Sequence, residues 1–213
     1  MRTLAMTMVR TVVVLLCVSA FAGAFAPAPA GFAAVRASAA ADRQAAPLPK
    51  ITEADVKFMQ GMIGHHTQAL AMVGLLKTRT ARDDMKLLGQ RIEVSQTDEI
   101  RMMKTWLTSH GKSVPSEADY KMMMAMPDMA MPGMLTQKQM DELSAAKGAD
   151  FDRLFLEYMI QHHQGAVAMV RTLMASPGAG QDSSVFQFAS DVEADQSAEI
   201  TRMRALRATM GKR

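Results

Sequence analysis

The sequence contains an internal repeat, which constrains the possible fold more than any other feature. The segment DVKFMQGMIGHHTQALAMV, residues 55–73, aligns with DRLFLEYMIQHHQGAVAMV, residues 152–170, at a constant offset of 97 residues. A second block, residues 93–103, aligns with residues 193–203 at an offset of 100 residues. The extra residues fall in the turn at 176–178, where an insertion costs little. Two related helical hairpins are therefore the expected building units.

Helical periodicity runs through both repeats. Apolar side chains recur every three to four positions, which indicates one buried stripe along each helix. Aromatic residues make up only 5% of the chain, fewer than the faces of a large β-sheet usually carry. The pattern predicts four long helices and one short helix, at residues 52–77, 82–109, 151–175, 183–210 and 137–147.

Capping motifs mark several of the helix starts. A Ser or Thr followed three residues later by an acidic residue or Gln favours an N-terminal cap. Three pairs are expected to act in this way, namely Thr52 with Asp55, Thr80 with Asp83, and Thr136 with Gln139. Gly148 is expected to end the short helix.

The two hairpins are expected to close on each other. Two hairpins with one apolar stripe per helix form an all-α four-helix bundle, here spanning residues 51–211. The hairpin repeats cover residues 51–111 and 150–211, and a long methionine-rich connection at residues 112–149 joins them.

The start of the chain is typical of an export signal. An arginine-containing start precedes an apolar stretch at residues 11–26, and no acidic residue occurs before Asp42. The apolar stretch is shorter than the about 20 residues of a membrane-spanning helix. We therefore expect a signal peptide and leader at residues 1–39, whose cleavage position stays open, and then a disordered tether at residues 40–50. An uncleaved membrane anchor is the alternative; after cleavage we expect no stable membrane insertion.

Charge and cysteine content argue against several functions. The formal net charge is +3, and Arg2, Arg10 and Arg36 in the leader account for it. The rest of the chain is balanced in charge, so we expect no nucleic-acid partner. The only cysteine, Cys17, also lies in the leader. The mature protein is then expected to lack disulfides, thiolate catalysis and cysteine zinc sites.

Each repeat carries a methionine just ahead of two adjacent histidines. The two groups are Met62 with His65 and His66, and Met159 with His162 and His163. In a helix, spacings of three and four residues place the thioether and both imidazoles on one side. A hydrogen-bonded core histidine beside a gap-filling methionine is the alternative interpretation. Because the group occurs in both repeats, metal ligation is favoured, and neutral imidazole with thioether suits Cu(I), with Ag(I) as its mimic.

Polar residues recur on the second helix of each hairpin. Gln96 and Glu99 in one repeat correspond to Gln196 and Glu199 in the other. Polar groups on an apolar seam need partners, so these residues are expected to hydrogen-bond the histidines or to bind the metal directly. A solvated or mutually paired edge of the bundle is equally compatible with the pattern.

The connection contains a dense cluster of methionines. Seven of them fall between residues 122 and 134, and Pro127, Pro132 and Gly133 argue against a regular helix there. The clustered thioethers suit Cu(I) or Ag(I), and the candidate ligands are Met126, Met129, Met131 and Met134. A hydrophobic flap over the bundle and a sacrificial oxidant sink are the alternatives.

Two common metal sites of helical proteins are absent from the sequence. A di-iron carboxylate bundle requires Glu-x-x-His, but methionine or isoleucine stands three residues before each paired histidine. The zinc motif His-Glu-x-x-His does not occur either.

The sequence resembles the family known as domain of unknown function 305. The similarity lies in MPGMLTQKQMDELSAAKGADFDRLFLEYMIQHHQGAVAMV, in MIGHHTQALAMV of the first repeat and in the two QxxEIxxM blocks, and it covers about residues 51–207. The resemblance implies a ferritin-like four-helix bundle exported by bacteria. Some relatives bind copper and support copper tolerance, which makes the paired histidines with Met62 and Met159 candidate ligands.

Together these features predict an exported protein, periplasmic or extracellular, that sequesters or carries Cu(I) without catalysis. Metal ions and another copper-handling protein are the expected partners. A metal-dependent oxidoreductase and a metal-free helical interaction module are the alternative functions.

Overall fold

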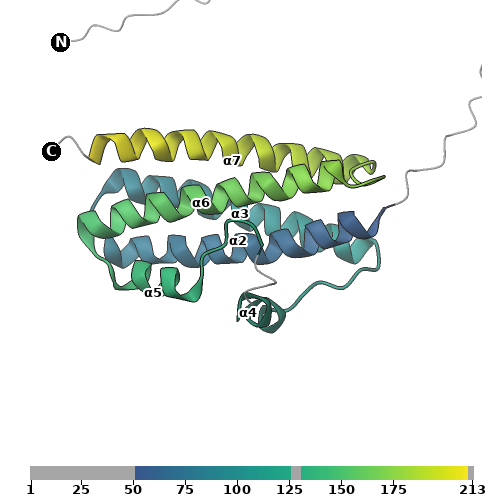
Figure 1. Ribbon diagram of the computed structural model, residues 1–213, viewed down its shortest axis with the longest axis horizontal. Coiled ribbons are helices and arrows are strands. Elements are labelled where there is room, and N and C mark those ends of the chain that lie inside the picture. Colours follow the sequence, from purple (N-terminus) through teal and green to yellow (C-terminus); the bar gives the residue numbers. More distant parts are fainter. Residues whose placement is uncertain (1–50, 126–130, 211–213) are drawn as a thin grey trace, which may run out of the picture. The chain divides into compact units, whose positions relative to one another are not determined.

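The computed structural model describes residues 51–125 and 131–210, and the regular secondary structure in those ranges is entirely helical (Figure 1). The long helices are α2 (Glu53–Arg79), α3 (Asp83–Ser109), α6 (Gly148–Ala175) and α7 (Ser183–Met210). The connection carries two short helices, α4 (Glu117–Ala125) and α5 (Gln137–Ala145). The predicted all-α fold is confirmed.

Several predictions fall on residues outside these ranges. They concern the leader at 1–39, the tether at 40–50, Met126, Met129 and the last residue of the predicted bundle, 211. Within the described ranges, no helix combines the length and the apolar character that crossing a membrane requires.

The four long helices pack as two antiparallel hairpins. Helix α2 pairs with α3, α6 pairs with α7, and α2 also packs against α6 (Figure 1). The first half of α2 shares a hydrophobic cluster with the last part of α6, so these two helices run in opposite directions. The other two helices are also in contact, because the Trp106 Nε1–H near the end of α3 donates to Ser184 Oγ at the start of α7, at 3.1 Å. The chain therefore forms a four-helix bundle whose hairpins are joined by a long crossover.

The apolar interior consists of two clusters along the bundle axis. The first core contains Met59, Met62 and Met103, and the second contains Met72 and Met203, all at most 1% exposed. Unbranched methionine side chains adapt to irregular gaps, which suits a bundle with few aromatic residues. The two cores are separated in both α2 and α6 by the histidine pairs. The polar residues of the site are thus held between two dry layers.

Two of the three predicted caps are confirmed. Thr52 and Asp55 form a reciprocal capping box at the start of α2, and Thr136 with Gln139 does the same for α5. The buried Asp55 has a second role, because its Oδ1 accepts a hydrogen bond from the Gly180 N–H at 2.7 Å. It thereby ties the first turn of α2 to the turn between α6 and α7.

Two local predictions are wrong. Thr80 does not cap α3, which begins after Arg82 without a side-chain cap; instead Thr80 Oγ1 accepts from the Arg82 N–H at 3.1 Å within the turn. Gly148 does not end the short helix, since α5 ends at Ala145 and Gly148 is the first residue of α6. Its φ of +57° makes the sharp change of direction between them.

Part of the methionine cluster is helical, contrary to prediction. Helix α4 includes residues 122–124 and ends at Ala125, before Pro127. It starts with a reciprocal pair, in which the Ser116 N–H donates to Asp119 Oδ2 at 2.7 Å and the Asp119 N–H donates to Ser116 Oγ at 3.3 Å. The proline limits the helix at its end but does not prevent it upstream.

Candidate metal centre

The two histidine pairs meet in the middle of the bundle. The ring centroids of His65 and His162 are 3.8 Å apart, and within each pair the adjacent rings are 6.3 Å apart. All four side chains are fully buried, between the two cores. The antiparallel packing of α2 and α6 therefore brings the equivalent residues of the two repeats to one level.

Two glutamates, one from α3 and one from α7, each form a hydrogen bond with one histidine of a pair. His66 Nε2 lies 2.5 Å from Glu99 Oε2, and His163 Nε2 lies 2.6 Å from Glu199 Oε2. Both carboxylates are at least nine-tenths buried. An ionised carboxylate can only accept, so each imidazole donates from Nε2. In a neutral imidazole this arrangement leaves Nδ1 as the nitrogen with a lone pair.

A third histidine, His65 of α2, forms a hydrogen bond with the connection. His65 Nε2 donates to the backbone carbonyl of Pro132 at 3.0 Å, and a carbonyl can only accept. His65 is therefore also fixed with its proton on Nε2 and its lone pair on Nδ1.

The remaining ring nitrogens have no hydrogen-bond partner among the described residues. These atoms are Nδ1 of all four histidines and, in His162, Nε2 as well. A buried polar atom without a partner costs about 1–3 kcal/mol. An imidazole that binds a metal offers the lone pair of one ring nitrogen while the other nitrogen donates a hydrogen bond that orients the ring.

Burial keeps the central imidazoles neutral. It lowers the pKa of His65 to about 3, and the proximity of His66 acts in the same direction, while the bond to Pro132 acts against it. Burial also lowers the pKa of His162 well below its usual range, with further contributions from the neighbouring histidines. The rings are therefore uncharged at neutral pH, the state in which they can bind a metal.

Met62 and Met159 lie on opposite sides of the histidine layer. Both side chains are fully buried, Met62 in the first core and Met159 in the second. The antiparallel arrangement of α2 and α6 thus gives the histidines a thioether neighbour in each direction along the bundle.

The two glutamines behave differently from the glutamates. Both amide atoms of Gln96, and Oε1 of Gln196, are buried without a hydrogen-bond partner in the described part of the chain. The hydrogen bonds expected to the histidines are thus formed by Glu99 and Glu199 and not by Gln96 and Gln196.

The last part of the connection is fastened onto α2 and α6. Gln68 forms a pair of hydrogen bonds with the backbone of Leu135, donating at 2.9 Å and accepting at 2.8 Å. Pro132 lies so close to α6 that a Cβ placed on Gly165 would be 1.9 Å from the Pro132 carbonyl oxygen. Sequence reasoning missed these contacts with Gln68, Pro132 and Gly165. Their only signal was that Gln68 and Gly165, although equivalent in the repeat, are different residues.

The predicted ligands of the connection are only partly described. Met131 and Met134 are half-buried next to this docked segment, whereas Met126 and Met129 are outside the described residues. In residues 51–125 and 131–210, no three or more His, Cys, Asp or Glu side chains are grouped so that they could hold an ion.

A groove on the α3 and α7 face reaches the carboxylate side of the histidine layer. It has a volume of about 410 Å³, and its lining includes Ser95, Asp98, Glu99, Asp191 and Asp195. Burial raises the pKa of Asp195, and the negative charges of Glu99, Glu199 and Asp191 raise it further. The field of the two histidine-bound carboxylates therefore extends to this face.

Comparisons with known proteins agree with the fold. The family described as Domain of unknown function (DUF305) matches residues 55–207. A comparison with curated proteins gave no match.

Several solved structures are similar to this chain. A DUF305 protein from Streptomyces coelicolor, inferred to be secreted, is 28% identical with a TM-score of 0.63, covering 74% of this chain and 94% of its own. A DUF305 fragment from Deinococcus radiodurans is 30% identical with a TM-score of 0.61, and the match covers 78% of this chain and 100% of the fragment. CopM in its Cu(I)-bound form is 28% identical with a TM-score of 0.56, and the match covers 73% of this chain and 96% of CopM. CopM has also been solved in Ag-bound and Cu(II)-bound forms.

Proposed function

Because this chain belongs to the DUF305 family, whose fold it shares with the copper-bound CopM, we propose that it is an exported protein that sequesters or carries Cu(I). The proposed ligands are the buried histidines, His65, His66, His162 and His163, together with Met62 and Met159. Binding occurs without catalysis, and another copper-handling protein is the proposed source or recipient of the metal.

One observation carries this proposal. Four imidazoles are buried in one layer, three of them bond an oxygen acceptor through Nε2, and none of the four Nδ1 atoms has a hydrogen-bond partner among the described residues. Metal-binding histidines typically donate their other ring N–H to a carboxylate or a backbone carbonyl. Histidines that only filled the core would leave several polar atoms without compensation.

The surroundings favour a soft, monovalent ion. Thioethers are soft and uncharged, so Met62 and Met159 stabilise Cu(I) or Ag(I) far more than Zn(II) or Mn(II). A monovalent ion also loses less hydration energy than a divalent one when it enters an apolar interior. Glu99 and Glu199, which bond the Nε2 atoms of His66 and His163, would offset its positive charge from the far side of the rings.

Relatives support the same metal. CopM, which shares the fold at 28% identity, was solved with Cu(I), with Cu(II) and with silver. The DUF305 protein from Streptomyces coelicolor, inferred to be secreted, supports export, in agreement with the leader predicted at residues 1–39.

A competition titration tests the proposal. The mature protein is titrated against a Cu(I) chelator in reductant, and then against excess Zn(II). We expect at least one tightly bound Cu(I) that zinc does not displace. A protein that binds no Cu(I), or that exchanges it for zinc, would contradict the proposal.

A further inference from the structure

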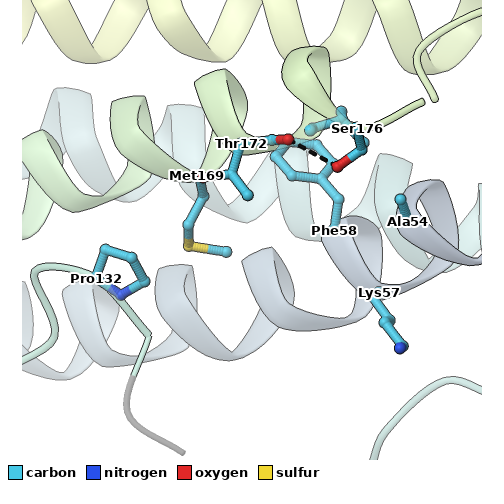
Figure 2. A pocket seen from close by; sticks show the side chains of 8 residues that line it. Ala54, Lys57, Phe58, Pro132, Met169, Thr172 and Ser176 are labelled. Carbon is cyan, nitrogen blue, oxygen red and sulfur yellow. Dashed lines mark hydrogen bonds between the residues drawn. The ribbon is translucent and has the colours of Figure 1, made fainter. Parts of the chain in front are cut away.

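A pocket opens between α2, α6 and the end of the methionine-rich connection (Figure 2). It has a volume of about 300 Å³. Its lining consists of Ala54, Lys57 and Phe58 of α2, Met169, Thr172, Leu173 and Ser176 of α6, and Pro132 of the connection. Met169 extends from α6 towards α2 in Figure 2, so its sulfur lies between the two helices.

Two methionines converge beside this pocket on the bare backbone of Gly61. A Cβ placed on Gly61 would be 3.1 Å from Met131 Sδ and 3.5 Å from Met169 Cε. The two thioether groups are therefore neighbours, and both side chains are only half-buried. In the other repeat, Tyr158 stands at the position of Gly61. The space for this thioether pair is thus confined to the face that carries the connection.

The pocket offers sulfur rather than charged oxygen. Its lining contains no carboxylate, and its one charged residue, Lys57, points away from Met169 (Figure 2). The hydroxyls of Thr172 and Ser176 donate to backbone carbonyls, at 3.0 and 2.8 Å. A hard divalent cation finds no strong ligand in this lining, whereas a soft monovalent cation finds the thioether of Met169 in the pocket and that of Met131 beside it at Gly61.

The thioether pair is joined to the histidine layer through one residue. Pro132 follows Met131 directly, and its carbonyl accepts the hydrogen bond from His65 Nε2. An ion held by Met131 therefore sits on the same short segment that covers His65.

We propose that Met131 and Met169 form a surface capture site for Cu(I), from which the ion passes to His65 and His162. The transfer is a ligand exchange, in which sulfur–copper bonds break as nitrogen–copper bonds form and copper stays Cu(I) throughout. This inference rests on the proposed function, since it assigns an access route to the same histidine centre. Met169 was not among the ligands expected from the sequence.

Loading kinetics test the capture site. Cu(I) is supplied from a chromophoric chelator to wild-type protein, to M131L/M169L and to the control M102L/M174L, whose methionines are exposed and lie elsewhere on the bundle. Leucine nearly conserves volume, so the fold should survive. We expect M131L/M169L to lose the Cu(I) equivalent bound at the capture site, which is the weaker of the two sites. Its histidine centre should load about tenfold more slowly, because a lost capture step lowers the association rate. Its histidine centre should keep its affinity, and the control should match wild type.

The outcomes separate this inference from the proposed function. If wild-type protein binds no Cu(I), both are overturned. If M131L/M169L loads the histidine centre at the wild-type rate and with the same number of equivalents, only the capture site is overturned.

A second measurement does not depend on the variant. Wild-type protein labelled with 13C in its methionine methyl groups is titrated with Ag(I) and followed by NMR. The Met131 and Met169 signals should shift in the titration while that of Met174 stays in place. Unchanged Met131 and Met169 signals would overturn the capture site.

Discussion

The imidazole rings of His65 and His162 face each other at 3.8 Å between their centroids, although the two residues lie 97 positions apart in the chain. They occupy the same position in the two repeats, and α2 and α6 bring them together because these helices run antiparallel. A duplicated hairpin thus forms one central layer, and each copy contributes half of its histidines. His65 is bonded to the connection, through the Pro132 carbonyl.

The two carboxylates should tune the metal affinity without being ligands. We expect E99Q/E199Q to bind Cu(I) about 10–100-fold more weakly, since partners of ligand histidines usually contribute that much. The repeat offers a matched control in E93Q/E193Q, which changes the same charge at residues that do not bond the histidines. Chelator competition measures both variants. Equal affinities in the two variants would contradict a role for the Glu99 and Glu199 hydrogen bonds in copper binding.

Replacing the buried methionines should separate copper binding from packing. In M62L/M159L the helix propensity and the volume are nearly conserved, so the melting temperature should change little. If both sulfurs bind the ion, Cu(I) affinity should fall by roughly tenfold, or about 1.4 kcal/mol, while Zn(II) binding stays the same. Isothermal titration with each metal measures this. Unchanged Cu(I) affinity would mean that both residues only pack the core and do not bind the ion.

The metal-free protein should lose stability as the pH falls. His65 has a folded-state pKa of about 3 against about 6.5 when unfolded, so the unfolded chain binds the proton more readily. Its contribution is fully present above about pH 6.5 and declines as the pH falls towards 3. At pH 5, His65 alone should remove roughly 2 kcal/mol of the free energy of unfolding.

Urea unfolding at pH 7 and pH 5 checks this prediction. H65Q should show a smaller loss between the two pH values than wild type, because glutamine does not titrate. A free energy of unfolding that is the same at both pH values, or higher at pH 5, would contradict the burial of neutral histidines.

Two glycine substitutions should have opposite effects on stability. Gly74 lies in α2 with nothing near its Cβ position, so G74A should stabilise the protein by about 1 kcal/mol through helix propensity. Gly165 lies in α6 against the Pro132 carbonyl, so G165A should displace the connection and destabilise. Thermal unfolding gives the sign for each variant, and hydrogen exchange of Leu135 reports whether the connection has loosened. A stabilising G165A would mean that the docked segment is not held as described.

The hairpins and their level alignment could be predicted from the repeat, because equivalent residues in a duplicated bundle meet by symmetry. Reciprocal caps such as Thr52 with Asp55 could also be predicted, since they depend on four consecutive residues. The same motif at Thr80 failed because the turn between α2 and α3 delays the helix start to Asp83. Ser116 with Asp119 has the same motif and begins α4, which ends before the prolines that argue against a helix further along the connection.

The docking of the connection could not be predicted from periodicity, since it depends on where the repeat departs from symmetry. Gly61, Gly64 and Gln68 correspond to Tyr158, Gln161 and Gly165. Gly61 makes room for Met131, Gly64 for Tyr120 and Gly165 for Pro132. Gln68 bonds Leu135. Each of these differences marks a contact with the connection, which has no counterpart in the repeat. The sequence shows where the two repeats differ, but the contacts at those positions are seen in the folded bundle.

The central claim is that Cu(I) binds to the Nδ1 atoms of the buried histidines. The most direct measurement is an anomalous difference map, collected at the copper edge, from crystals of the Cu(I)-loaded protein. The account predicts a peak in the layer between the two cores, within bonding distance of Nδ1 of His65 or His162. A map with copper only at surface methionines, and no peak in the histidine layer, would contradict it.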